Sequence, residues 1–398
     1  MLRKISTIDF KSSNTTSGKT VLIRVDYNVP VENELVTDDY RILKSIPTIK
    51  YCLDQGAKVV LMSHMGRPKG KVDSKYSLIP AGEKLAELLE MPIKFSEDCI
   101  SEDAIDVSKN LKDGEIHLLE NLRFYNEETE NNSDFASQLA RHGSIYINDA
   151  FSCSHRAHAS IYEIPKFLPS FSGLQLDLEV NALNKITSEI TRPITCIIGG
   201  SKISTKINVI KNLIPKFDNI IIVGGMANNF IEYFGNSVGK SIKEKNCNKI
   251  VEEIISLSKK EKCKIICPED VIVSKYLNGS PQKKELNEVL SDEMILDIGP
   301  KTIDKITKII DNSKTILWNG PAGYFENPNF AYGSIQIAKK IIENNKANKI
   351  FSVAGGGDTV SLLNNLKAVN EFNFVSTAGG AFLEYLEGKN LPGITALN

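Results

Sequence analysis

Two lysines follow a glycine pair in the stretch TCIIGGSKISTKINVIKNLI, residues 195–214. The apolar run before the glycines predicts a strand, and Ser201 stands where the N-cap of the next helix is expected. Glycine lets backbone N–H groups approach a ligand closely, and a helix N-terminus favours negative charge. Lys202 and Lys206 would add two cations to one face of the first turn. The stretch predicts an anion-binding loop without Walker A spacing, and a loop with two solvated lysines is the alternative.

The first half of the chain alternates short apolar runs with helical periodicity, which is typical of a parallel sheet covered by helices. These runs lie at 21–25, 58–62, 115–119 and 144–147. We expect a helix after the first run, capped by Asp38, with Pro47 at a kink or in its first turn. A second helix is expected over 79–89. His117 and His142 are interpreted as core residues rather than as parts of a site.

Charged and polar residues follow each of these runs. Asp26 and Asn28 come after the first run, and Arg67, Arg123 and Arg156 come after the other three. In an open parallel sheet, ligands bind beyond the carboxyl ends of the strands. A guanidinium recognises carboxylate or phosphate through two parallel hydrogen bonds. One such arginine is more often a surface charge, but three at one sheet edge favour a site for a small polyanion.

The second half repeats the alternation with glycines at its strand ends. Apolar runs lie at 195–198, 219–223, 264–267, 315–318, 349–353 and 372–375, and five of the six end in glycine-containing turns. Backbone can approach a phosphate chain or a purine there without obstruction by side chains. Asp358 either caps the following helix, which that segment alone favours, or binds Mg²⁺ beside a nucleotide. Glu326 is a candidate acceptor for ribose hydroxyls, with an ordinary exposed carboxylate as the alternative.

Composition sets the broad class. A chain of 398 residues with 41% apolar and 24% charged residues is typical of a globular protein of two domains. The net charge of −1 gives no overall attraction to nucleic acid or anionic membranes. No run is long enough to cross a bilayer, and the N-terminus lacks the apolar region of a secretory signal. Seven cysteines without framework spacing indicate free thiols in a reducing compartment, with Cys263 and Cys267 as buried thiols rather than a metal pair.

These patterns predict an α/β fold of two doubly wound parallel-sheet, Rossmann-like domains that face each other across a hinged cleft. The expected division is an N-terminal domain over 1–172, a connecting helix over 173–190, a C-terminal nucleotide-binding domain over 191–380 and a tail over 381–398. Within the tail, Phe382 to Leu386 is expected to be helical and LPGITALN extended.

A basic site in one domain and a glycine-lined site in the other indicate phosphoryl transfer between two ligands, because that reaction needs positioning and charge neutralisation above all. A two-domain dehydrogenase is disfavoured, since none of the glycine turns has the GxGxxG pattern followed by an acidic residue. A non-catalytic hinged protein that binds an anion and a nucleotide remains the alternative. It does not account for paired lysines together with a carboxylate able to bind Mg²⁺.

The chain resembles phosphoglycerate kinases. The motifs that carry the resemblance are, in order, RVDYNVP, DDYRI, SHMGRPKG, LLENLRF, NDAFSCSHRAHAS, GGSKISTK, LDIGP, WNGPAGYFE, GGGDT and STAGGAFLEYLEGKNLPG. They span nearly the whole chain. The resemblance implies reversible, Mg²⁺-dependent transfer of a phosphoryl group from 1,3-bisphosphoglycerate to ADP, which gives 3-phosphoglycerate and ATP. It also implies a cytoplasmic monomer that binds neither nucleic acid nor membrane, with a tail that returns to the N-terminal domain.

The resemblance also assigns residues. Those that would hold the phosphoglycerate are Asp26, Asn28, Arg41, His64, Arg67, Arg123 and Arg156. Those that would hold the nucleotide are Lys206, Gly299, Glu326, Gly356, Gly357, Asp358 and Thr359. Lys202 and Arg41 would act on the phosphoryl group in transit, and Asp358 would bind Mg²⁺. Arg41 comes from the family match alone.

Two positions depart from the family pattern. Ala378 stands where a third glycine is usual, and Ser152 stands where a glycine usually follows Asp-Ala-Phe. If position 378 required a positive φ, alanine there would lower stability and weaken nucleotide binding. Neither departure replaces a charged group, so activity is expected to survive both.

Overall fold

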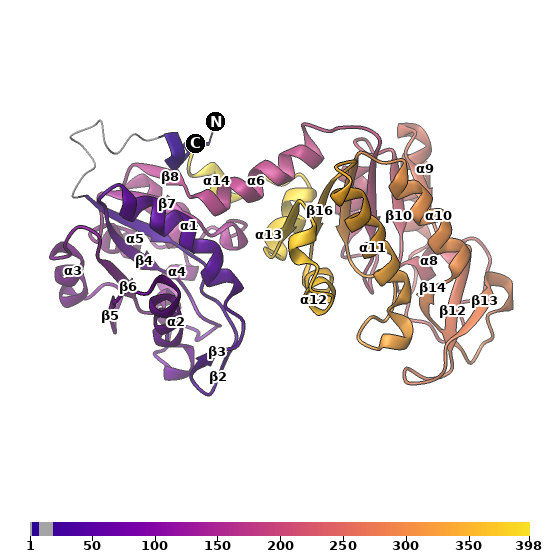
Figure 1. Ribbon diagram of the computed structural model, residues 1–398, viewed down its shortest axis with the longest axis horizontal. Helices are drawn as coiled ribbons and strands as arrows, with labels where there is room; N and C mark the ends of the chain where they lie inside the picture. Colours follow the sequence, from indigo (N-terminus) through magenta and orange to yellow (C-terminus); the bar gives the residue numbers. More distant parts are fainter. Residues whose placement is uncertain (1, 8–18) are drawn as a thin grey trace. The chain divides into compact units, whose positions relative to one another are not determined.

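The computed structural model describes residues 2–7 and 19–398, and the chain divides into two compact units. Unit 1 comprises Met1–Val180 together with Asn390–Asn398, and unit 2 comprises Asn181–Lys389. Each unit is built around a six-stranded sheet. Figure 1 labels many of the elements of both.

Unit 1 contains a parallel sheet of strand order β5-β6-β4-β1-β7-β8. Its strands are β1 (Thr20–Arg24), β4 (Lys58–Met62), β5 (Ile93–Ser96), β6 (Ile116–Leu119), β7 (Ile145–Asn148) and β8 (Ser170–Ser172). The four predicted runs form the four central strands, which are buried and apolar as expected for a sheet covered on both faces. The two strands that prediction missed lie at the edges, where burial is partial and the apolar signal is weak. A short hairpin of β2 (Val31–Glu32) and β3 (Leu35–Val36) follows β1.

The helices of unit 1 are α1 (Tyr40–Asp54), α2 (Ile79–Leu89), α3 (Glu102–Lys109), α4 (Asn126–Thr129), α5 (Ser133–Ala140) and α14 (Pro392–Thr395). Pro47 does not lie in the first turn, because α1 begins at Tyr40 and continues past the proline, which is exposed; the alternative of a kink stays a prediction. The N-cap position of α1 is held by Asp39. The carboxylate of Asp38 nevertheless accepts a hydrogen bond from the backbone N–H of Tyr40, at 3.0 Å.

Unit 2 contains a second parallel sheet, of order β11-β10-β9-β15-β16-β17. Its strands are β9 (Ile194–Ile198), β10 (Asn219–Ile222), β11 (Lys264–Ile266), β15 (Thr315–Asn319), β16 (Phe351–Gly355) and β17 (Phe374–Ser376). All six correspond to predicted runs. The helices are α7 (Ile207–Leu213), α8 (Ala227–Tyr233), α9 (Asn248–Glu261), α10 (Pro300–Asp311), α11 (Tyr332–Lys346), α12 (Gly357–Asn365) and α13 (Gly380–Leu386).

A small antiparallel sheet in unit 2 was not predicted. Its strands are β12 (Asp270–Ser274), β13 (Gln282–Glu285) and β14 (Met294–Ile298), in the order β13-β12-β14. Strand β13 reads QKKE and is largely exposed, so it carries no alternation of apolar and polar residues. Pairing with β12, rather than its own side chains, makes it a strand.

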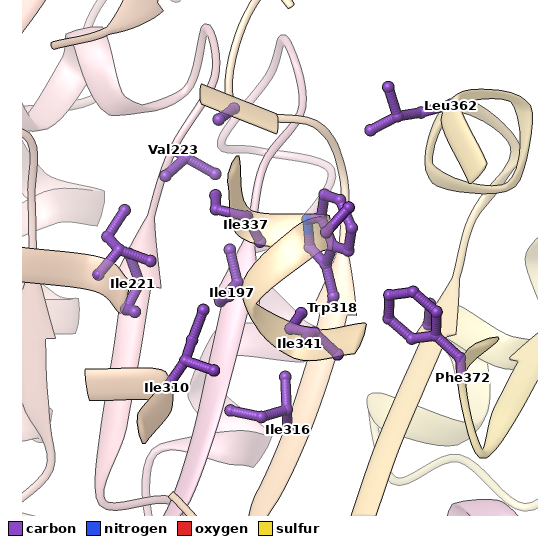
Figure 2. Close-up of a cluster of buried hydrophobic side chains, with 14 of the residues drawn as sticks. Ile197, Ile221, Val223, Ile310, Ile316, Trp318, Ile337, Ile341, Leu362 and Phe372 are labelled. Atoms are coloured by element: carbon purple, nitrogen blue, oxygen red, sulfur yellow. The ribbon is translucent and has the colours of Figure 1, made fainter. Parts of the chain in front are cut away.

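The core of unit 2 is a cluster of isoleucines around one tryptophan (Figure 2). Trp318 is fully buried on β15, and its indole ring lies 6.2 Å from the ring of Phe372, centroid to centroid. The indole N–H donates to the backbone carbonyl of Gly320 at 2.8 Å, so its one polar atom is satisfied. This hydrogen bond joins the buried core to the glycine-containing turn that follows β15.

Helix α6 (Leu174–Thr187) forms where the connecting helix was expected, and the boundary between the units falls within it. The end of the chain differs from expectation in two respects. Residues 381–389 belong to unit 2, because α13 buries Phe382 and the carbonyl of Leu386 accepts a hydrogen bond from Asn212. The segment after them is helical rather than extended, and Gly393 bonds through its N–H to the carbonyl of Ser154 at 2.8 Å. Among the described residues, we find no helix with the length and apolar character needed to span a membrane.

Two histidines of unit 1 share one serine in the core. The hydroxyl of Ser108 lies 2.8 Å from Nδ1 of His117 and 2.7 Å from Nδ1 of His142, and all three side chains are buried. Nε2 of His142 faces the carbonyl of Cys99 at 2.9 Å and must donate to it, so Nδ1 of neutral His142 accepts the serine O–H. Ser108 then accepts from Nδ1 of His117. Both histidines are structural, as predicted.

Burial lowers the pKa of His117 to about 3 and that of His142 to about 4. In the unfolded chain both return to an ordinary value near 6.5, so the unfolded state binds more protons between about pH 4 and 6.5. The free energy of unfolding should therefore rise with pH through this window and level off above it. Replacing His117 by Gln, which keeps polar atoms but cannot titrate, should reduce the slope by up to about 1.4 kcal/mol per pH unit. Urea unfolding from pH 4.5 to 7.5 measures this, and equal slopes for both proteins would contradict it.

Candidate functional site

Asp26, Asn28 and Arg41 form a hydrogen-bonded group in unit 1, next to the carboxyl end of β1. Nη1 of Arg41, which comes from α1, lies 3.0 Å from Oδ2 of Asp26 and donates to the carbonyl of Asn28 at 2.9 Å. The N–H of Asn28 donates to Oδ1 of Asp26 at 3.1 Å. The side-chain oxygen of Asn28 accepts from the N–H of Gly66 at 2.9 Å, which joins the loops after β1 and β4. The tertiary structure thus holds Arg41 beside two residues of the predicted anion site.

His64 is held by Arg24, a residue that the sequence analysis did not single out. Arg24 ends β1 and is fully buried; its Nη2 lies 3.0 Å from Nδ1 of His64, and its Nε donates to the hydroxyl of Ser160 at 2.9 Å. A guanidinium only donates, so Nδ1 of His64 accepts and the ring hydrogen is on Nε2. Burial, and then the charges of Arg24 and Arg123, hold the pKa of His64 well below its usual range. His64 is therefore a neutral hydrogen-bond donor. Arg24 could have been singled out from the sequence, because a charged residue at the end of an apolar strand is unusual.

The three predicted arginines differ in their surroundings. Arg123 is buried in the loop after β6, where Nη1 donates to the carbonyl of Gly66 at 2.8 Å and Nε has no hydrogen-bond partner among the described residues. Arg67 and Arg156 are exposed, and Nε of Arg156 donates to Nε2 of His155 at 3.1 Å. An unpartnered buried donor is costly unless a ligand satisfies it. Nε of Arg123 therefore points to an anion as the missing partner.

One group of side chains in this site could in principle hold a metal ion. Ligand atoms of Asp26, His64 and Cys153 lie within 4.8 Å of one another. Arg41 already pairs with Asp26, however, and Arg24 donates to Nδ1 of His64. Two guanidinium groups at the ligand atoms make the position unfavourable for a cation. The donors around these three side chains favour an anion over a cation.

Unit 2 contains a cavity of about 400 Å³ at the carboxyl ends of its sheet strands. Its glycine-rich wall includes Gly200, Gly224, Gly225 and Gly323, and its apolar wall includes Ile231, Ile242 and Leu277. Three carboxylates, those of Asp297, Glu326 and Asp358, also line it. A mostly apolar cavity with a few convergent polar groups has the character of a small-molecule site.

Lys202 and Lys206 were expected in the first turn of a helix capped by Ser201, and the structure of the loop after β9 differs from this expectation. Helix α7 begins at Ile207 with Lys206 at its N-cap, so Ser201 does not cap it, and Lys202 is an exposed loop residue. The glycines before it are needed for packing: a Cβ on Gly199 would lie 2.4 Å from the carbonyl oxygen of Pro321, and Gly200 has φ +132°. Nζ of Lys206 donates to the side-chain oxygen of Asn319, and burial lowers the pKa of Lys206.

Asp358 does not cap a helix, which overturns the preference drawn from its segment alone. Helix α12 begins at Gly357 behind Gly356, whose φ of +96° suits only glycine, and no side chain caps its N-terminus. Asp358 is exposed and lines the cavity. Thr359 is buried, and its hydroxyl accepts from the N–H of Gly320 at 2.7 Å. The threonine thus ties the turn after β16 to the turn after β15.

Gly299 and Glu326 take different positions around the cavity. Glu326 is exposed and lines it. Gly299 is the N-cap of α10 and packs on the carboxylate of Asp270, where a Cβ would lie 2.3 Å from Cγ; it is not among the residues that line the cavity. The sequence analysis missed Asp297, a carboxylate within the apolar run MILDI that forms β14. It accepts from the N–H groups of Ile298 and Gly333, at 2.8 and 2.7 Å, and burial raises its pKa to about 7.

Ala378 is unstrained. Among the described residues it is not one of the non-glycine residues with positive φ, whereas Gly379 next to it has φ +52°. The side chain of Ala378 is buried, with 5% of its surface exposed. The loop therefore needs glycine at 379 but not at 378.

An arginine-lined anion site on one doubly wound sheet and a glycine-lined cavity on another define a phosphotransferase of two α/β units. A sequence model of the family described as "Phosphoglycerate kinase" matches residues 11–389. Phosphoglycerate kinase of Methylorubrum extorquens strain PA1 is 45% identical over 382 residues, covering 96% of each chain. That of Bradyrhizobium diazoefficiens is 44% identical over 399 residues, covering 100% of this chain and 99% of its own.

Solved structures agree with the sequence comparisons. The structure of phosphoglycerate kinase from Coxiella burnetii matches with a TM-score of 0.90 at 34% identity, covering 100% of this chain and 99% of that one. The structure of phosphoglycerate kinase from Pyrococcus horikoshii OT3 matches with a TM-score of 0.82 at 28% identity. The chain belongs to the phosphoglycerate kinase family. Its reaction is the glycolytic phosphoryl transfer of that family, with a carboxyl group as acceptor.

Replacing Ala378 by Gly tests whether the departure at this position matters. Because alanine is unstrained here, glycine should only add freedom to the unfolded chain, which lowers the free energy of unfolding by about 0.4–1 kcal/mol. The KM for ATP should not change. Urea unfolding and steady-state kinetics measure the two quantities. A sharp fall in that KM would contradict the prediction and show that alanine compromises the nucleotide loop.

Proposed function

We propose that unit 1 binds 3-phosphoglycerate or 1,3-bisphosphoglycerate at its arginine site, and that unit 2 binds ADP or ATP in its glycine-lined cavity. The observation that carries the proposal is the set of arginine side chains around His64 and Asp26. A neutral histidine donor, an unpartnered arginine nitrogen and one carboxylate among cations suit a ligand with several negative charges and a hydroxyl group.

In this proposal the arginines neutralise the carboxylate and the phosphate of the substrate. The residues assigned to the phosphoglycerate are Asp26, Asn28, Arg41, His64, Arg67, Arg123 and Arg156. His64 would donate through Nε2, since Arg24 occupies Nδ1. Arg67 and Arg156 are exposed and free to adjust to a ligand, whereas Arg24 is fixed by burial and supports the others.

Of the residues that we assign to the nucleotide, some line the cavity and others shape the loops around it. Asp358 and Glu326 line the cavity, and we assign Glu326 to the ribose hydroxyls. Lys206 would neutralise the nucleotide phosphates, because its lowered pKa reflects a buried cation that an anion would stabilise. The residues assigned to shaping the phosphate turns and the cavity edge are Gly299, Gly356, Gly357 and Thr359.

Lys202 and Arg41 are the two cations that we assign to the phosphoryl group during transfer. Phosphoryl transfer places little covalent demand on a protein, and its barrier falls mainly through positioning and charge stabilisation. Lys202 is exposed on the loop after β9 and makes no helix cap, so its ammonium group is available for that purpose. Its removal should therefore affect turnover more than binding of the phosphoglycerate.

Asp358 is the residue that we assign to Mg²⁺. Its carboxylate lines the cavity and is not engaged as a helix cap, which suits an ion that takes one carboxylate together with phosphate oxygens. Bound Mg²⁺ would supply charge neutralisation for the nucleotide phosphates.

Family membership also leads us to propose a cytoplasmic monomer that binds neither nucleic acid nor membrane. Light scattering after gel filtration measures the oligomeric state.

Replacing Lys202 by Ala tests the function and the catalytic role together. In a coupled assay of 3-phosphoglycerate with ATP, kcat should fall by about 10²–10³-fold, as for the loss of one group that stabilises transition-state charge. Calorimetry should show unchanged binding of 3-phosphoglycerate. Lys245→Ala, another exposed lysine of unit 2, is the matched control and should keep full activity. An unmodified protein that binds both ligands without turnover would instead support the non-catalytic binding protein.

Replacing Asp358 by Asn tests the metal assignment. An amide is a weaker ligand for Mg²⁺ than a carboxylate, so the Mg²⁺ concentration for half-maximal activity should rise by about tenfold or more. The KM for 3-phosphoglycerate should stay the same. Asp304→Asn removes a carboxylate of α10 that pairs with Lys308 and serves as the control. An unchanged Mg²⁺ requirement in Asp358→Asn would remove this residue from the metal site.

A further inference from the structure

Ser152 makes a contact inside the anion site that none of the assignments above uses. It lies in the short 3₁₀ turn Phe151–Cys153 after β7, and its side chain is partly buried. Its hydroxyl donates to Oδ2 of Asp26 at 2.5 Å, although the two residues are 126 positions apart. The contact therefore depends on the adjacent strands β1 and β7, which end at the same edge of the sheet.

Three donors converge on the carboxylate of Asp26. Oδ2 receives the hydroxyl of Ser152 and lies 3.0 Å from Nη1 of Arg41, and Oδ1 receives the N–H of Asn28. A carboxylate oxygen accepts about two hydrogen bonds, so Oδ2 is saturated and Oδ1 has one position left. A ligand can therefore reach Asp26 only by donating to Oδ1.

The proposed substrate has one group that fits this requirement. Its carboxylate and phosphate are acceptors, which the arginines and His64 satisfy as donors. Its C2 hydroxyl is the only donor that it carries, and such a donor needs an acceptor in a site otherwise rich in donors. The open position on Oδ1 of Asp26 is that acceptor.

We infer that Ser152 is a positioning residue that holds Asp26 to recognise the C2 hydroxyl of the phosphoglycerate substrate, an inference that rests on the proposed function. Donors on both carboxylate oxygens prevent the group from turning about its terminal bond. Without the serine hydroxyl, one position on Oδ2 is open to water and the carboxylate is held from fewer directions. Such loss of preorganisation weakens binding of the ligand group that depends on it.

This contact is specific to chains with a hydroxyl at position 152. A glycine at this position would have no side chain to donate to Asp26. Cys153 does not substitute for it, since its Sγ is buried 3.9 Å from Nη2 of Arg24 and from Nδ1 of His64. The hydroxyl of Ser152 is thus an additional determinant of substrate recognition in this protein.

The test compares Ser152→Ala, Ser152→Gly and Ser152→Thr in the intact protein. The KM and Kd for 3-phosphoglycerate should rise about three- to tenfold in the Ala and Gly variants, as expected for one lost hydrogen bond, and stay near the original values in the Thr variant. The KM for ATP should not change. Ser170→Ala, a buried serine whose hydroxyl donates to the carbonyl of Leu168, controls for loss of a buried hydroxyl in unit 1.

A second ligand separates positioning from a merely structural role. 3-Phosphonooxypropanoate carries both anionic groups but lacks the C2 hydroxyl, so calorimetry should give the same Kd for it with the original protein and with Ser152→Ala. Equal weakening of both ligands would overturn the inference, and so would an unchanged Kd for 3-phosphoglycerate. If the Ala variant does not fold, the Gly and Thr variants decide by the same comparison. Failure of the original protein to turn over 3-phosphoglycerate would contradict the proposed function, while the calorimetric comparison would still decide the role of Ser152.

Discussion

A buried guanidinium group is the constraint on which the anion site of unit 1 depends. Arg24 is fully enclosed at the end of β1, where a charge without partners would be strongly unfavourable. It donates to the carbonyl of Val25, to Ser160 and to His64, and Ser160 in turn donates to the buried carboxylate of Glu128. This continuous network, together with burial, explains why His64 is neutral and why its free hydrogen is on Nε2.

Close packing of backbone plays the corresponding role in unit 2. The turn after β9 lies against the turn after β15 so closely that Gly199 and Gly320 admit no side chain, and Thr359 ties the latter turn to the start of α12. These turns contribute Gly200 and Pro321 to the lining of the cavity, and the hydrogen bond from Trp318 to Gly320 joins them to the core shown in Figure 2. The glycines are needed here for contact between loops as much as for access of a ligand. Ala378, which lies outside these contacts and has an ordinary φ, shows that not every glycine of the family pattern is required.

The two units handle charge differently. Unit 1 places Arg41, Arg24 and the neutral His64 around the partly buried carboxylate of Asp26, while unit 2 places three carboxylates around a mostly apolar cavity. Each arrangement suits its proposed ligand, a small polyanion in one case and a nucleotide with a divalent cation in the other. The chain as a whole stays near neutrality, with a net charge of −1, so recognition rests on local arrangement.

The sequence by itself determined the α/β class and the ten strands that its apolar runs predicted, four in unit 1 and six in unit 2, because buried parallel strands leave a strong local signal. It did not reveal the small sheet of β12, β13 and β14, in which β13 exists through pairing with β12 rather than through its own pattern. Only the tertiary structure decided that Ser201 does not cap α7, that Asp358 does not cap α12, and that the end of the chain is helical. Only the tertiary structure places Arg24 next to His64 and Ser152 next to Asp26. Contacts between residues far apart in the chain depend on which strands lie side by side.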